Sequence, residues 1–327
     1  MDIQKTAESI RGKQGREVFQ QVLVDVGESH RDVVVVGADS FRSIRGLDFE
    51  NRFPERSFNV GIAEQNAVGI AAGLAVSGKL PIVLMFGFTI ARALEQIRSS
   101  ICYPDLNVRI ITTATGLDMG EGGVTHHCTE DIGLLRTIAN MTIVQPASGL
   151  ETIFATHATV DQVCGPAYLR LTRQTFCEEA EEVVEDYYAR GGEFRIGEPV
   201  VLREGTDIAL IGSGLTVGLA LKVADELKKE GVDASVLNVH TIKPLDERLL
   251  RELSQSIPRI ITMEDHNVIG GLGEGVAGVV SRWGSARVLR VGINDVFCEI
   301  GKPAELCTHH GLCTDRVVEL ATSFLGG

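Results

Sequence analysis

The sequence predicts an α/β protein made of two doubly wound parallel-sheet domains. Short apolar runs rich in β-branched residues alternate with longer helix-like stretches, which is the pattern of parallel strands covered by helices on both faces. The alternation breaks once, at residues 177–199, where the chain is acidic, weakly periodic and ends in glycine and proline. The length of 327 residues is comfortable for two domains.

The first domain is expected to span residues 1–176. Its strands are runs such as DVVVVGAD and PIVLMF, which are apolar throughout because a parallel strand buries both of its faces. The expected strands are 32–39, 81–86, 107–114, 141–146 and 167–171. The expected helices are 15–28, 62–77, 89–102, 129–139 and 149–160.

A linker at residues 177–194 is expected to lead into a second domain at 195–327. There the same alternation resumes. The expected strands are 207–212, 233–239, 259–264 and 286–292, and the expected helices are 216–230, 246–256, 271–283 and 315–325.

Composition and charge exclude several functions. Acidic residues outnumber basic ones by 44 to 31, and the net charge of −13 argues against nonspecific nucleic-acid binding. Residues 60–78 are almost uncharged, but Glu64, Gln65 and Asn66 and several glycines make a membrane span a poor interpretation. We expect instead a helix packed closely against another helix or a second subunit, because small residues allow close backbone approach.

The cysteines and the polar first residues favour a cytoplasmic protein. The seven cysteines are an odd number without a CxxC pair, so free thiols in a reducing compartment are expected. The opening segment MDIQKTAESIRGKQGR lacks the apolar core of a signal peptide.

Polar residues that follow the strands are the first candidates for a site, because parallel α/β sheets bind ligands outside the carboxyl ends of their strands. Asp39 follows the first strand, and Arg173 follows the fifth. The third strand leads into a glycine-rich loop, residues 116–127, that carries His126 and His127. Glycines let backbone approach a ligand, although a flexible surface loop would have the same composition.

No metal-binding residue is expected in this chain. His126, His127 and Cys128 are adjacent, and ligands on one short segment cannot easily all point at one ion. The sequence contains no second cluster that we interpret as having ligand spacing.

Several long motifs together make the family recognisable. They are FNVGIAEQNAVGIAAGLAVSGKLPIV, RALEQIRSSICYPDLNVRI, GEGGVTHHCTEDIGLLRTIANMTIVQPA, YLRLTRQ, NVHTIKPLDE and EDHNVIGGLGEGVA. In this order they resemble the pyrimidine-binding and C-terminal domains of the transketolase family, over nearly the whole chain. The resemblance implies an enzyme that depends on thiamine diphosphate and Mg²⁺.

The resemblance also implies a partner. In the family an amino-terminal domain, marked by GDG and a later asparagine, holds the cofactor's diphosphate through Mg²⁺, and no GDG occurs here. We therefore expect a separate N-terminal transketolase subunit that binds most of the metal. The expected assembly is α₂β₂, with a self-dimer of this chain at its centre and the active site between the two kinds of subunit.

The family's site residues carry over one at a time. Glu64, in GIAEQN, matches the glutamate that hydrogen-bonds N1′ of the cofactor's aminopyrimidine; the rival interpretation is a helix-start acid favoured by the helix dipole. Phe88 matches the aromatic that stacks on the pyrimidine, or is plain core. Asp39 matches an acid near the cofactor, and His126 a histidine that faces the substrate near the reactive carbon. Arg173 matches an arginine that binds the substrate's terminal phosphate, with a surface salt bridge as the alternative.

Departures from the family pattern argue against the ordinary pentose-phosphate sugars as substrates. Ala114 stands where the family has a histidine that contacts the donor's C1 hydroxyl, and Gly122 where it has an aspartate that reads an acceptor hydroxyl. Both remove polar partners for sugar hydroxyls. Asp118 is a departure in the other direction, and we expect it to contact substrate.

The resulting prediction is two-carbon transfer from a ketose or ketose-phosphate donor to an aldehyde. A pyruvate-type donor is the first alternative, as in deoxyxylulose-phosphate synthase or the beta subunit of a 2-oxoacid dehydrogenase. A non-catalytic scaffold subunit is the second.

Overall fold

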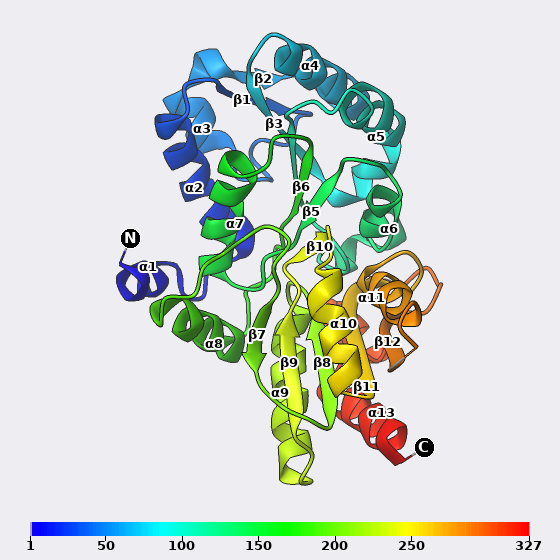
Figure 1. Ribbon diagram of the computed structural model, residues 1–327. Helices are drawn as coiled ribbons and strands as arrows, with labels where there is room; N and C mark the ends of the chain where they lie inside the picture. Colours follow the sequence, from blue (N-terminus) through cyan, green and yellow to red (C-terminus); the bar gives the residue numbers. More distant parts are fainter. Residues whose placement is uncertain (1, 285, 327) are drawn as a thin grey trace.

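The structure, a computed structural model, describes residues 2–284 and 286–326. It has two lobes, each built on one sheet with helices packed on both faces (Figure 1). The predicted α/β class and the two-sheet architecture are therefore confirmed. Both sheets are dominated by parallel pairs, and each also contains one antiparallel pair that the sequence did not predict.

The first sheet has seven strands in the order β10-β5-β6-β4-β3-β1-β2. All of its neighbours are parallel except β10 and β5. Its strands are β1 (Val33–Gly37), β2 (Ser57–Asn59), β3 (Leu80–Phe86), β4 (Arg109–Thr113), β5 (Thr142–Val144), β6 (Ala167–Arg170) and β10 (Thr241–Lys243).

The second sheet has five strands in the order β12-β11-β8-β9-β7. Only β7 runs antiparallel to its neighbour β9. The strands are β7 (Val200–Arg203), β8 (Ile208–Gly212), β9 (Ala234–Asn238), β11 (Arg259–Asn267) and β12 (Arg287–Ile293).

The helices cover both faces of the sheets. Those before the second lobe are α1 (Ile3–Ile10), α2 (Gly15–Ser29), α3 (Leu47–Arg52), α4 (Glu64–Val76), α5 (Ile90–Gln96), α6 (Asp131–Arg136), α7 (Gly149–Asp161) and α8 (Glu178–Ala189). Those of the second lobe are α9 (Thr216–Lys229), α10 (Glu247–Ser256), α11 (Leu272–Ser281), α12 (Pro303–His309) and α13 (Thr314–Gly326).

Most of the strands that were expected from apolar runs are buried on both faces, whereas the expected edge strand β12 is buried only in its last three residues. Every residue of β1, β4, β8 and β9 is buried. The short strand β2, with the sequence SFN, lies at the sheet edge and is largely exposed, so it has no apolar run that could reveal it. A continuous run of apolar residues, which burial on two faces favours, is thus what made a strand predictable.

Part of the expected linker is instead a helix. Residues Glu178–Ala189 form α8, which buries Ala180, Val184 and Tyr188 on one face. These residues are spaced four apart, as one face of a helix requires. The many acids that suggested a linker include three in the first turn, where the positive end of the helix dipole favours them.

The two lobes are joined by more than the connecting chain. Strand β10 belongs by sequence to the second lobe but pairs with β5 at the edge of the first sheet (Figure 1). A buried charge network, here called the Arg170 network, also crosses the boundary. In it Arg170 Nε lies 2.8 Å from Asp131 Oδ2 in the first lobe, and Arg170 Nη1 lies 2.7 Å from Asp265 Oδ1 in the second.

Helix α4 has one bare face at the outer end of the first lobe (Figure 1). A Cβ atom added at Gly69 or Gly73 would meet nothing within 4 Å. Ile62 and Val76, at the two ends of this face, are 76% and 75% exposed. Among the described residues, no helix is long and apolar enough to cross a membrane. The face therefore has the small, apolar character of a contact surface that the sequence predicted.

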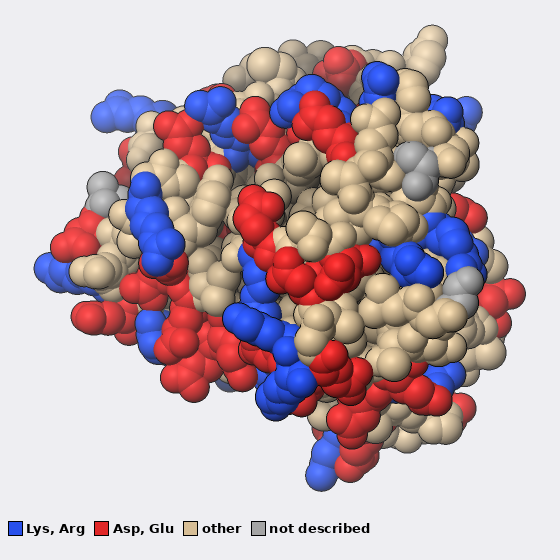
Figure 2. Space-filling view, turned by 60° about the horizontal axis from the view of Figure 1, so that its bottom comes forward, with Lys and Arg blue, Asp and Glu red and all other residues tan. Residues whose placement is uncertain are grey.

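The surface charge matches the acidic composition. Figure 2 shows acidic side chains in bands across the face that turns forward from the bottom of Figure 1, with basic side chains in small groups between them. All seven cysteines are free thiols.

Candidate functional site

The glycine-rich segment at residues 116–127, here called the glycine loop, begins close to the carboxyl end of β4. Reciprocal backbone hydrogen bonds of 2.8 and 2.9 Å between Gly116 and Cys128 close its base. The loop starts beyond Ala114, which has a positive φ of 59° and is fully buried. A non-glycine residue in this conformation is uncommon and turns the chain sharply away from the strand. The loop is therefore a closed, ordered structure at the edge where α/β proteins bind ligands.

Phe88 and His126 lie against each other. Phe88 follows β3, and its ring stacks on Phe86 with a centroid separation of 5.2 Å and an interplanar angle of 9°. The ring of His126, on the glycine loop, is 4.8 Å from that of Phe88. Both side chains are half-buried, so each keeps a surface that a ligand could contact. The structure thus brings together two residues that the sequence placed in one site.

Gly122 leaves room for the His126 ring. A Cβ atom at Gly122 would lie 2.9 Å from Cβ and 3.0 Å from Cγ of His126. Any larger residue at position 122 would push the histidine aside or move the loop. The glycine at this departure from the family pattern is therefore coupled to the position of His126.

Arg173 lies in a cavity of about 350 Å³ together with a second arginine, Arg16. The backbone N–H of Arg16 donates to Thr172 O at 3.2 Å, which fastens the start of α2 to the end of the strand before Arg173. Burial and then the charge of Arg173 lower the pKa of Arg16. Two guanidinium groups that face one cavity favour an anion there.

Arg16 was missed by sequence reasoning. It lies at the start of the first predicted helix, 157 positions before Arg173 by the numbering, and no local pattern links the two. Only the fold, which places the start of α2 against the end of β6, shows that they share a cavity.

Asp118 connects the glycine loop to the turn that carries Arg173. Its Oδ2 accepts from the backbone N–H of Arg173 at 2.7 Å, and its Oδ1 accepts from Thr172 Oγ1 at 2.8 Å. Burial raises the pKa of Asp118 to about 6, although these two hydrogen bonds act in the opposite direction. Asp118 also lines the arginine cavity, so it both holds the turn and faces a possible ligand.

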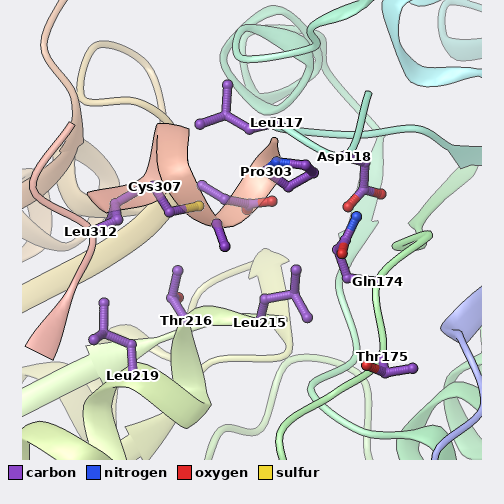
Figure 3. Close-up of a pocket in the computed structure, with 12 residues that line it drawn as sticks. Leu117, Asp118, Gln174, Thr175, Leu215, Thr216, Leu219, Pro303, Cys307 and Leu312 are labelled. Carbon is purple, nitrogen blue, oxygen red and sulfur yellow. The ribbon is translucent and has the colours of Figure 1, made fainter. Parts of the chain in front are cut away.

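A second cavity of about 220 Å³ lies on the other side of Asp118, between the lobes (Figure 3). Asp118, Gln174 and Pro303 line both cavities. The remaining lining of the second cavity is mostly apolar and includes Leu117, and Cys307 on α12.

Glu64 is buried and has a partner. It is the first residue of α4, is 4% exposed, and its Oε2 lies 3.0 Å from Arg92 Nη1. Arg92 belongs to α5 and is itself more than half exposed. A helix start and a partly solvated arginine explain how this carboxylate can be buried. They also mean that the helix-start interpretation of Glu64 describes part of what the residue does.

Asp39 is exposed and lies with Asn59. It has a positive φ of 57°, and its backbone N–H donates to Asn59 Oδ1 at 3.0 Å. Within residues 2–284 and 286–326, the hydrogen bonds and ion pairs of Asp39 and Glu64 do not connect them to Phe88 or His126. The predicted residues therefore fall into four places: the Phe88–His126 pair, the Asp118–Arg173 cavity, Glu64 with Arg92, and Asp39 with Asn59.

Comparison with protein families accounts for most of the chain. Residues 12–178 match the family described as transketolase, pyrimidine binding domain. Residues 197–317 match the family described as transketolase, C-terminal domain.

Similar proteins span the same two regions. The chain is 32% identical, over 94% of its length and 92% of the relative, to a 6-deoxy-6-sulfo-D-fructose transketolase subunit of Clostridium sp. (strain MSTE9). It is 36% identical, over 94% of its length, to the 1-deoxy-D-xylulose-5-phosphate synthase of Desulforudis audaxviator (strain MP104C), of which it spans 48%. A solved structure entitled "Split gene transketolase, inactive beta4 tetramer" is 38% identical, with a TM-score of 0.86 over 96% of this chain and 99% of that one.

Proposed function

The chain belongs to the transketolase family, and we propose that it is one subunit of a thiamine-diphosphate-dependent enzyme that transfers a two-carbon unit from a ketose or ketose phosphate to an aldehyde. The observation that carries this proposal is the ordered glycine loop, which places His126 against Phe88 and Asp118 beside the arginine cavity. A histidine that faces the reactive carbon and two arginines that can bind an anion, at the same edge of the sheet, suit an extended phosphorylated substrate.

Glu64, Phe88 and Asp39 would contact the cofactor. Phe88 has a half-buried ring that can stack on an aminopyrimidine, and Glu64 is a buried carboxyl group that can share a proton with the ring nitrogen N1′. The bound cofactor supplies carbanion chemistry that no side chain offers. The role of Glu64 is to hold a proton at the pyrimidine, with Arg92 as the group that balances its charge before the cofactor binds.

His126 and the arginine cavity would bind the substrate. His126 Nδ1 lies 3.0 Å from Thr125 Oγ1, which leaves Nε2 free to face a carbonyl oxygen. Arg16 and Arg173 would hold the anionic end of the substrate with charge-assisted hydrogen bonds. Asp118 keeps Arg173 in position through its backbone N–H.

The departures from the family pattern bear on substrate choice. Ala114 is fully buried and offers no polar atom, and Gly122 leaves its space to His126. The site therefore lacks two of the family's hydroxyl contacts, which favours substrates other than common pentose phosphates. The relative named for a sulfonated ketose shows that a subunit of this length can act on a sugar with another anionic end.

A pyruvate-type donor is the second candidate. Ala114 favours it, because pyruvate has no C1 hydroxyl for a histidine to contact, and the similarity to a deoxyxylulose-phosphate synthase points the same way. Screening donors with the assembled enzyme separates the two, since only one of hydroxypyruvate and pyruvate would support transfer to an aldehyde phosphate.

We place this chain in the cytoplasm as part of an α₂β₂ complex with a separate N-terminal subunit that supplies the Mg²⁺ site. The bare face of α4, with Gly69 and Gly73 at its centre, suits a self-dimer because two backbones can approach closely there. The related solved structure bears the words "inactive beta4 tetramer" in its title, which is consistent with self-association without a partner and with activity that needs one.

The test uses a tagged chain purified with its native partner and thiamine diphosphate. Glu64→Gln should lower kcat by about 10²- to 10⁴-fold, and Arg173→Gln should raise KM for a phosphorylated substrate by about 10- to 100-fold, as expected for a charge-assisted hydrogen bond. Arg190→Gln, which removes an arginine whose side chain is 77% exposed, is the matched control and should change neither. Normal turnover in Glu64→Gln would refute a catalytic role and favour a scaffold subunit.

A further inference from the structure

Two histidines at the end of α12 and a glutamate from the loop before that helix converge on one another. Glu299 lies in the segment between β12 and α12, residues 294–302, here called the edge loop. His309 is the last residue of α12, and His310 follows it. His309 Nε2 is 3.6 Å from Glu299 Oε1, and His310 Nε2 is 3.2 Å from Glu299 Oε2. One ligand atom from each residue lies within 4.8 Å of the other two.

These separations are compatible with three ligands of one divalent ion as well as with two histidine–carboxylate ion pairs. Zn²⁺ takes imidazole nitrogen and carboxylate oxygen at about 2.0–2.1 Å, so neighbouring ligands of a tetrahedral ion lie roughly 3.3–3.4 Å apart. The two nitrogen–oxygen separations, 3.6 and 3.2 Å, bracket that value. The two histidine side chains are set at 85° to each other, so their nitrogens can approach a common point from different directions.

The environment of the cluster favours binding in a second way. His310 Nε2 is buried and faces Glu299 Oε2 at 3.2 Å, but the two atoms are not aligned as a hydrogen bond, so the nitrogen lone pair can turn to an ion. The side chains of Glu299 and His309 are 61% and 65% exposed, while that of His310 is 9% exposed. One ligand is thus fixed in the protein, and the other two leave a path by which an ion can enter.

From this geometry we propose that Glu299, His309 and His310 form a three-ligand site for a divalent ion of the Zn²⁺ type. Two imidazoles and one carboxylate select such ions over Mg²⁺ or Ca²⁺, which prefer oxygen ligands alone. The sequence predicted no metal ligand, because adjacent residues such as His126, His127 and Cys128 cannot easily all point at one ion. Here Glu299, ten positions before His309, completes the set. This site is separate from the Mg²⁺ expected on the partner subunit.

The proposed ion would fasten the edge loop to α12, and through it the glycine loop. The backbone N–H of Gly301 donates to Gly120 O at 3.3 Å. A Cβ atom at Gly123 would lie 3.0 Å from Ile300, so the two loops are in close contact. Figure 3 shows α12, with Pro303 and Cys307, beside Leu117 and Asp118 of the glycine loop. An ion bound by Glu299, His309 and His310 would therefore restrict the edge loop, which packs against the glycine loop that carries Asp118 and His126.

Calorimetric titration of the metal-free, full-length chain with Zn²⁺ tests the site, and Co²⁺ absorption reports its geometry. We expect about one equivalent per chain and a tetrahedral or five-coordinate Co²⁺ spectrum. His310→Ala and Glu299→Gln should each lower the Zn²⁺ affinity by roughly a hundredfold or more, because even outer-shell groups are worth about 10- to 100-fold. His30→Ala is the matched control: it removes a histidine 3.1 Å from a single carboxylate, that of Asp161.

Hydrogen exchange tests the connection between the loops without an activity assay. Zn²⁺ should slow exchange of the Gly301 amide in the wild-type chain and in His30→Ala, and leave it unchanged in His310→Ala. Absence of Zn²⁺ binding would overturn the site. Binding that survives His310→Ala but is lost in Cys307→Ser would assign the ion to thiols and would also overturn it. Binding without slower exchange at Gly301 would refute the link to the glycine loop. None of these outcomes depends on the proposed transferase activity.

Discussion

Replacing Asp131 by asparagine removes one charge from the Arg170 network. Asp131 and Arg170 are fully buried, and Asp131 accepts hydrogen bonds from Arg170 Nε at 2.8 Å and from Tyr168 Oη at 2.5 Å. Burial would raise the pKa of Asp131, but Arg170 and His266 hold it below its ordinary value. The carboxylate is therefore charged in the folded protein, and Asp131→Asn would leave Arg170 with one anionic partner instead of two.

The expected cost is about 3–5 kcal/mol of unfolding free energy, the range for removing one partner from a buried ion pair. The structure favours the lower half of that range, because Asp265 Oδ1 still contacts Arg170 at 2.7 Å. Asp265→Asn should cost about 2–4 kcal/mol, since the Asp265 side chain keeps 11% of its surface accessible and Asp131 remains to neutralise the arginine. Both variants weaken the boundary between the lobes.

Urea unfolding followed by circular dichroism measures these differences. Glu252→Gln is the control, because its pair with Arg248 at 3.1 Å is largely exposed and should contribute less than about 1 kcal/mol. If Asp131→Asn lost less than about 1 kcal/mol, the network would behave like a surface pair, and the argument from its burial would be wrong.

Three further predictions concern single positions. Burial raises the pKa of Glu264 from its ordinary value of 4.5 to about 7. The contribution of this group to stability is therefore fully present below pH 4.5 and is lost as the pH rises through about 7. Between these two pH values the unfolding free energy of the wild type, measured in urea, should fall by about 3 kcal/mol relative to that of Glu264→Gln. Different slopes of unfolding free energy against pH for the two proteins would support this, and parallel curves would contradict it. Gly73→Leu should not lower thermal stability, because an added Cβ meets nothing within 4 Å in one chain and leucine is a better helix former than glycine. It should weaken self-association measured by sedimentation, and an unchanged sedimentation profile would remove α4 from the interface. Gly122→Asp should displace His126 and lower turnover of the assembled enzyme, and equal turnover would show that the loop adjusts.

The sequence could predict an element whose pattern lies within its own residues, but not one that depends on pairing with distant segments. The strands β1, β4 and β8 are buried on both faces, so their apolar runs were visible without any partner. The edge strand β2 and the antiparallel β10 are three residues each and depend on pairing with distant segments. Helix α8 was hidden because its acids resemble a solvated linker until Ala180, Val184 and Tyr188 are seen on one face.

For the candidate site, too, residues within a motif could be predicted from the sequence, but contacts between distant segments could not. The motif resemblance identified Glu64, Phe88 and His126 as candidates, and the structure places Phe88 against His126. It could not identify Arg92 as the partner of Glu64 or Arg16 as the neighbour of Arg173, because those contacts form only when separate helices pack. Nor could spacing alone show that His126 lies directly against the position of Gly122.

The crossing of β10 into the first sheet limits where this polypeptide can be divided. A fragment that ended at residue 194 would leave β5 paired only with β6, with its other edge an unprotected apolar strand edge prone to intermolecular pairing. The complementary fragment would carry β10 with nothing to pair against. A boundary drawn by composition between two α/β units is therefore not a boundary at which either unit can be produced alone, and protein engineers who wish to exchange the second lobe would have to carry β5 and β10 together.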